Sequence, residues 1–225
     1  MRKKSEENLD VLTGEIGVIF SRLTGGFVSA DTEKKMYWWG LPGLGLAGVN
    51  DFLSIFLLYY YNQILGLSAA LAGLALFISV VFDAISDPVI AYWSDRHNGE
   101  YGRRIPFMLI GILPMSLCCL SLFVLHLGDE QWILFAQLTV LIVLFRLSQT
   151  VFAVPRFALG VELYKEYSKR NQLIGTDRVF EIFGIALCLG PIMLLMPGWD
   201  DAGFYPWAAL WVSLLLGWSA YLGTV

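Results

Sequence analysis

From residue 36 onward, long runs of hydrophobic residues alternate with short polar segments. Each run is close to the ~20 residues that an α-helix needs to cross the hydrocarbon layer of a bilayer. Lipid offers no partner to an open backbone, so helices are the structures expected for such runs. The pattern predicts an all-α membrane protein with a six-helix bundle over 36–225. Its spans are expected over about 36–61, 70–93, 105–127, 132–155, 177–197 and 204–225.

Residues 1–35 are instead charged and mixed, which predicts a cytoplasmic N-terminal tail. No short apolar stretch with a cleavage site follows the basic start, so the tail does not resemble a signal peptide. Apolar residues recur at helical spacing at Leu12, Ile16, Ile19, Leu23 and Phe27. This spacing is typical of an amphipathic helix on the membrane surface, and a tail without regular structure is the alternative.

Lysine and arginine are spread unevenly over the polar segments. The tail holds six, 94–104 holds three and 156–178 holds five, whereas 62–69, 128–131 and 198–203 hold none. Positively charged loops stay on the cytoplasmic side, so both termini are predicted to be cytoplasmic. The expected location is the plasma membrane or a bacterial inner membrane.

Composition agrees with a lipid environment, with 57% hydrophobic residues, 15% charged residues and a mean hydropathy of +0.64. The net charge of −4 and the absence of a basic stripe with interleaved aromatics argue against a nucleic-acid partner. The expected partners are the lipid bilayer and a small-molecule substrate, with no cofactor.

Several ionisable residues lie within the predicted spans, where each costs a few kcal/mol without a partner or a watery cavity. They are Asp51, Asp83, Asp87, Arg146 and Glu181. Asp83 and Asp87 are four residues apart, which places both carboxylates on one helix face. They cannot both stay ionised there without a cation or a shared proton, which predicts a site of the sodium type. The alternative is that they pair with Arg146 or Arg178 and only hold helices together.

The same region carries a family resemblance. The stretch from Leu58 to Pro88, LYYYNQILGLSAALAGLALFISVVFDAISDP, resembles the first two helices of the glycoside-pentoside-hexuronide:cation symporters. These form the melibiose-carrier-like branch of the major facilitator superfamily. The resemblance covers about residues 37 to 197 and implies the N-terminal half of that superfamily's fold. It also implies that Asp83 and Asp87 bind the coupling Na⁺, Li⁺ or H⁺.

A second element of the resemblance is the join after the second span. Asp95 with Gly102, Arg103 and Arg104 resembles the superfamily's loop between helices two and three, which implies a role in conformational gating. Loop arginines that signal orientation are the alternative.

The candidate cargo site departs from sugar-carrying members. Ala47 and Ala153 stand where those members have sugar-binding aspartates, although Asp51 lies one turn after Ala47. A neighbouring aromatic position of the sugar-carrying members is kept here only as Phe157. Arg178 matches the family's fifth-helix arginine. Candidate substrate-binding residues are therefore Asp51, Arg146, Arg178 and Glu181.

Arg146 favours a cargo with a carboxylate, sulfonate or phosphate group, because guanidinium binds such planar groups well. Alternatively, Arg146 is neutralised by Asp51 or Glu181, and Arg178 forms a local helix pair with Glu181. The predicted function is cation-coupled transport of a sugar-related or anionic organic solute.

Other functions compete with transport as interpretations of the sequence. An intramembrane enzyme is disfavoured because His97 and His126 lie near span ends without a metal-binding pattern or a nucleophile beside them. A scaffold or sensor that keeps the fold, and a carrier of lipid-related cargo, remain alternatives. Superfamily transporters need two six-helix halves. We therefore expect this chain to be a fragment that works with a C-terminal half, and a half-size subunit that dimerises is the alternative.

Overall fold

The computed structural model describes residues 30–97, 104–164, 166–196, 198 and 201–224. These residues form long helices and no strand, which confirms the predicted all-α fold. The chain runs through α2 (Ala30–Tyr59), a π-helical turn η1 (Tyr60–Ile64), α3 (Ala69–Arg96), α4 (Ile105–Val124), α5 (Gln131–Leu163), α6 (Tyr167–Leu195) and α7 (Phe204–Leu222).

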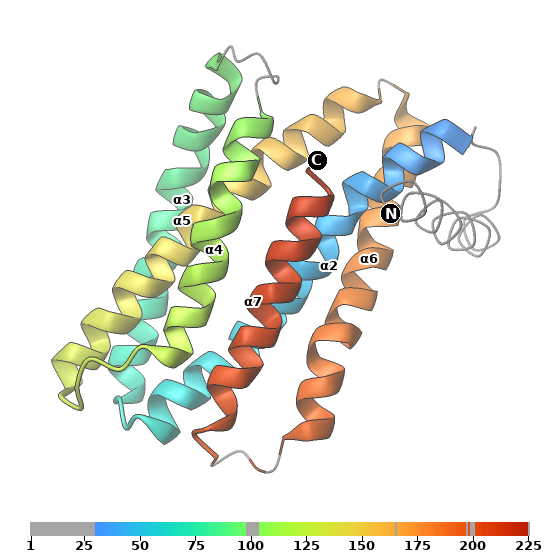
Figure 1. Cartoon of the computed structure of the whole chain (residues 1–225). Helices are drawn as coiled ribbons and strands as arrows, with labels where there is room; N and C mark the ends of the chain where they lie inside the picture. The colour runs from blue at the N-terminus through green and yellow to red at the C-terminus, as the bar shows by residue number, and fades with distance from the viewer. Residues whose placement is uncertain (1–29, 98–103, 165, 197, 199–200, 225) are drawn as a thin grey trace, which may run out of the picture.

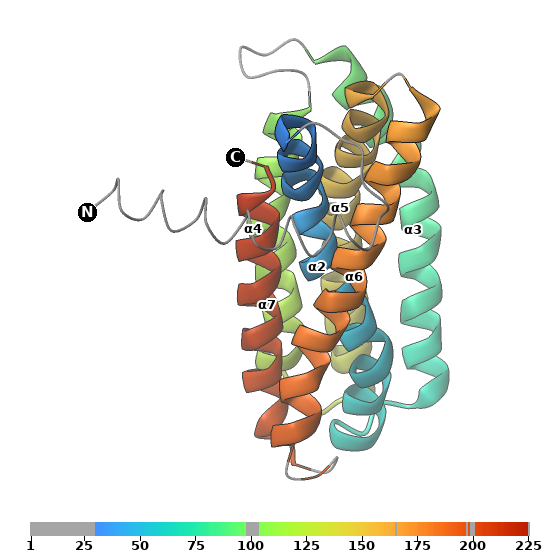
Figure 2. The same ribbon diagram turned by 90° about the vertical axis from the view of Figure 1, so that its right-hand side faces the viewer.

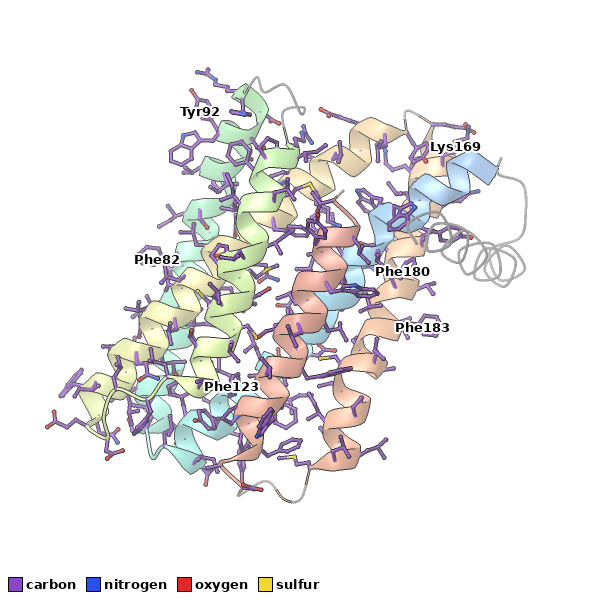
Figure 3. The ribbon with its side chains drawn as sticks, in the orientation of Figure 1. Phe82, Tyr92, Phe123, Lys169, Phe180 and Phe183 are labelled. Atoms are coloured by element: carbon purple, nitrogen blue, oxygen red, sulfur yellow. The ribbon has the colours of Figure 1, made fainter. Side chains whose placement is uncertain are left out.

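The helices stand side by side, as Figure 1 shows. Helix α2 packs against α6 and α7, α5 packs against α3 and α4, and contact between α4 and α7 closes the bundle. Figure 2 shows α4 and α7 on the side of the bundle opposite α3. Helices α3 and α6 each have one main neighbour. Phe82 on α3 and Phe183 on α6 extend outward (Figure 3) and are 54% and 60% exposed.

Aromatic rings form the core where α2, α4 and α7 meet. The ring of Phe52 lies 5.0 Å from that of Phe123, and the ring of Tyr60 lies 5.0 Å from that of Tyr205. The Tyr60 and Tyr61 hydroxyls donate hydrogen bonds to the carbonyls of Phe123 and Leu122, each at 3.1 Å. These bonds satisfy the phenol groups that the core buries.

Helices α2 and α6 approach closely at a glycine. A Cβ atom on Gly184 would overlap the backbone of Leu44, and one on Gly48 would lie 2.7 Å from the Cβ of Cys188. Small residues at such crossings let membrane helices pack backbone to backbone.

Within the described part of the chain, five helices are long and apolar enough to cross a membrane, and they correspond to the first five predicted spans. The sixth predicted span corresponds to α7, which packs against α2 and α4. Helix α7 is not among these five helices, and its sequence includes three tryptophans. The predicted polar join 156–178 is largely helical, because α5 continues to Leu163 and α6 begins at Tyr167. Charged side chains in these helices include the ion pairs of Arg156 with Asp177 and of Lys169 with Glu166. The tail residues 1–29 lie outside the described residues, and α2 begins at Ala30.

Candidate functional site

A polar cavity of about 460 Å³ opens between α2, α3 and α5. Each helix contributes the face that its period of 3.6 residues brings to this side. The lining residues are Asn50 and Ser54 from α2, Asp83 and Asp87 from α3, and Arg146, Gln149, Thr150, Ala153, Val154 and Phe157 from α5.

Asp83 lies at the centre of the contacts in this cavity. Its Oδ1 accepts a hydrogen bond of 3.0 Å from the Thr150 hydroxyl, and its Oδ2 lies 3.7 Å from Nη1 of Arg146. The side chains of Arg146 and Asp83 are 36% and 30% exposed, so water reaches the pair. Asp87, one turn further along α3, has no hydrogen-bond or ion-pair partner among the described residues.

The amide side chains complete the polar wall. Gln149 Nε2 donates to Oδ1 of Asn50 over 3.1 Å, and the Ser54 hydroxyl donates to the Asn50 carbonyl over 2.7 Å. The first bond joins α2 to α5 across the cavity. The arrangement offers carboxylate and hydroxyl oxygens that could hold a small cation, and amide and guanidinium donors for a polar solute.

The remaining candidate cargo residues are placed differently. Arg146 pairs with Asp83 rather than with Asp51 or Glu181. Arg178 and Glu181 form a local pair on α6 with a 2.5 Å contact, as the alternative interpretation expected. Asp51, Arg178 and Glu181 do not line the cavity.

The predicted gating loop is described at its two ends. Nη2 of Arg104 lies 2.9 Å from Oδ1 of Asp95 and 2.9 Å from Oε1 of Glu162. These contacts join the ends of α3, α4 and α5. Gly102 and Arg103 lie outside the described residues. Glu162 was not predicted, because it lies beyond the end of the predicted span 132–155.

Sequence reasoning also missed a buried cluster built on Arg156. Its Nη2 forms an ion pair with Asp177 Oδ1 of α6 and donates to the Trp39 carbonyl of α2 over 3.0 Å. The guanidinium also lies 4.6 Å from the centre of the Trp39 ring. Arg156 was counted as a loop charge because it follows an apolar run, and a separation of 21 residues gives no helical signal for the pairing.

Comparison with known proteins gives a consistent picture. A family model described as MFS/sugar transport protein matches residues 38–223. An uncharacterized symporter from Synechocystis sp. is 35% identical over 175 residues, which cover 76% of this chain and 32% of the relative.

Relatives from Escherichia coli include a symporter and a carrier homolog. The inner membrane symporter YicJ is 28% identical over 141 residues, covering 62% of this chain and 30% of the relative. A glucuronide carrier protein homolog is 33% identical over 96 residues, covering 40% of this chain and 21% of the relative. The chain thus spans about a third of these relatives' length, or less.

Proposed function

Because this chain belongs to the family of MFS/sugar transport proteins, we propose that it works in a cation-coupled symporter for a small organic solute. The proposal is for transport rather than catalysis. The observation that carries it is the pair Asp83 and Asp87, which line one polar cavity on a membrane-spanning helix. Carboxylates in such a helix are costly, and a coupling cation offsets that cost.

The chemistry of the cavity supports Na⁺, Li⁺ or H⁺ as the coupling ion. Hard cations prefer oxygen ligands, and the Thr150 hydroxyl keeps lone pairs while it donates to Asp83. Pro88 lies inside α3 and has no N–H to donate to the carbonyl of Ala84, so that oxygen lacks its usual helical donor.

The same cavity supports a cargo that carries a negative group. Arg146 supplies a guanidinium, while Ala153 supplies no carboxylate to grip sugar hydroxyls. One relative is named as a glucuronide carrier homolog, and a glucuronide joins a sugar ring to a carboxylate. We infer a sugar-related organic anion as the cargo class.

The transporter is proposed to include a second six-helix half in addition to this chain. Both termini of this chain are proposed to lie on the cytoplasmic side. Substrates of such transporters bind between the halves, and alternating access moves one half against the other. The exposed apolar sides of α3 and α6 are suited to contact with further helices or lipid.

The test of coupling is the thermal stability of the purified full-length protein in detergent. A ligand that binds only the folded state at 100 times its Kd adds about 2.7 kcal/mol to the free energy of unfolding. We expect NaCl, LiCl or a fall in pH to raise the melting temperature relative to choline chloride. Asp83→Asn and Asp87→Asn should each remove most of this response.

The two variants should differ in cation-free buffer. Asp87→Asn removes a carboxylate without a partner, so this variant should have a higher melting temperature than the wild type. Asp83→Asn leaves Arg146 without its counter-charge, so its melting temperature should rise by less. Asp129→Asn, in the loop before α5, makes the same charge change at a side chain that is 95% exposed, so it should respond as the wild type does. A wild type indifferent to cations and pH would refute coupling at this site.

A further inference from the structure

The contact between Arg146 and Asp83 is loose for an ion pair inside a bundle. Its 3.7 Å separation exceeds the 2.7–2.9 Å that is usual for a charge-assisted hydrogen bond. The Nε of Arg146 is buried and has no hydrogen-bond partner among the described residues. The guanidinium therefore keeps unused donors beside an open cavity.

The second feature is that a cation and Arg146 compete for the same carboxylate. Thr150 already bonds Oδ1 of Asp83, and Arg146 faces Oδ2. A cation that bridges Asp83 and Asp87 lies close to the Asp83 carboxylate on either oxygen, and the guanidinium 3.7 Å from Oδ2 repels it. Binding of the cation is thus easier when Arg146 turns away.

The third feature is what the displaced guanidinium can reach. The cavity offers Asn50, Gln149 and Ser54 as polar partners, and among the described residues Asp83 and Asp87 are the carboxylates that line it. Once a cation holds both, the amide and hydroxyl oxygens remain as neutral acceptors, and a negative group brought by the cargo is the counter-charge available to Arg146. A carboxylate or phosphate accepts the guanidinium fork in two parallel bonds.

We propose, on the premise of the cation-coupled transport above, that Arg146 is an exchangeable counter-ion of Asp83. The coupling cation takes its place at Asp83, and the released guanidinium binds the anionic group of the cargo. Cation and cargo then bind with positive cooperativity. The effect is reciprocal, since each ligand must raise the affinity for the other by the same factor.

The test measures the Na⁺ affinity of the full-length protein by titration calorimetry, with and without solute. The solutes are methyl β-glucuronide and glycerol 3-phosphate, and their uncharged counterparts are methyl β-glucoside and glycerol. In the wild type we expect at least one anion to raise Na⁺ affinity by about fivefold or more, and the uncharged counterparts to have no such effect.

Arg146→Gln should bind Na⁺ more tightly than the wild type without any solute, because the competing charge is gone, and should show no cooperativity with the anions. Arg146→Lys keeps a positive charge without the fork and should retain part of the cooperativity. Lys169→Gln removes a positive charge from a pair with Glu166 at the start of α6 and should behave as the wild type does.

The exchange is refuted if no anion changes Na⁺ affinity in the wild type, or if Arg146→Gln keeps both the affinity and the cooperativity of the wild type. If the glutamine variant does not fold, Arg146→Lys replaces it in the test, and full wild-type cooperativity in that variant would refute the exchange. A wild type that binds no Na⁺, Li⁺ or H⁺ under any condition would instead refute the coupling proposal, which is a distinguishable result.

Discussion

At the scale of single residues, Arg156 makes the most enclosed charged contact of the described chain. Its pair with Asp177 has side chains that are 1% and 5% exposed, and Trp39 covers the guanidinium from α2. A buried pair adds little stability relative to well-packed apolar residues, but loss of one partner leaves a buried charge alone. The pair joins α5 to α6, which otherwise touch little.

We expect Asp177→Ala to lower the free energy of unfolding by about 3–5 kcal/mol, because Arg156 is left without its counter-charge. The double variant Arg156→Met with Asp177→Leu should recover most of the loss. Unfolding in mixed detergent micelles measures both. Glu166→Ala, in an exposed pair with Lys169, should cost less than about 1 kcal/mol. A double variant as unstable as the single one would contradict this account.

Sequence alone could indicate Asp83 and Asp87, because ionisable residues within an apolar run are visible without coordinates. The partner of Arg146 could not be read in this way. The sequence offered four counter-charges for Arg146, and only helix packing brings Asp83 to it. The four were Asp51, Asp83, Asp87 and Glu181. Arg156 was missed since a charge at the end of a span looks like a loop residue until its distant partner is known.

At the scale of elements, Gly184 controls how closely α6 approaches α2. Gly184→Ala should destabilise the bundle by about 1–3 kcal/mol, because an added Cβ meets the Leu44 backbone, which cannot yield as a side chain does. Gly190 lies on the same helix, and a Cβ atom added there would have no neighbouring atom within 4 Å. Gly190→Ala should therefore be neutral or stabilising by up to about 1 kcal/mol. Melting temperatures compare the two, and equal losses would argue against close packing as the cause.

Hydrophobic runs predicted the centres of the helices well. An apolar run in lipid has to bond its own backbone groups, and a helix does so. They predicted the ends less well. Helix α5 continues past its apolar part to Leu163, since Arg156 and Glu162 find partners on other elements. Tertiary contacts of this kind are invisible to a local pattern.

At the scale of the whole molecule, the lysine and arginine asymmetry predicts orientation. Reporter fusions after Leu67, Gly128 and Asp201 should read as outside, and those after His97 and Tyr164 as inside. A paired alkaline phosphatase and fluorescent protein assay separates the two locations. The reversed pattern, or equal signals on both sides, would contradict the proposed arrangement.

The positive charge of Arg146 also has an electrical consequence. Moving one elementary charge across 100 mV is worth about 2.3 kcal/mol. With both carboxylates ionised, Asp83, Asp87 and Arg146 give the cavity a net charge of −1. One Na⁺ with a singly charged anion leaves that sum unchanged. Loaded and empty carriers then carry the same charge in opposite directions, so the work done by the membrane voltage cancels over one transport cycle. Accumulation of such a cargo would follow the sodium gradient alone, whereas an uncharged sugar with Na⁺ would also be drawn inward by the voltage.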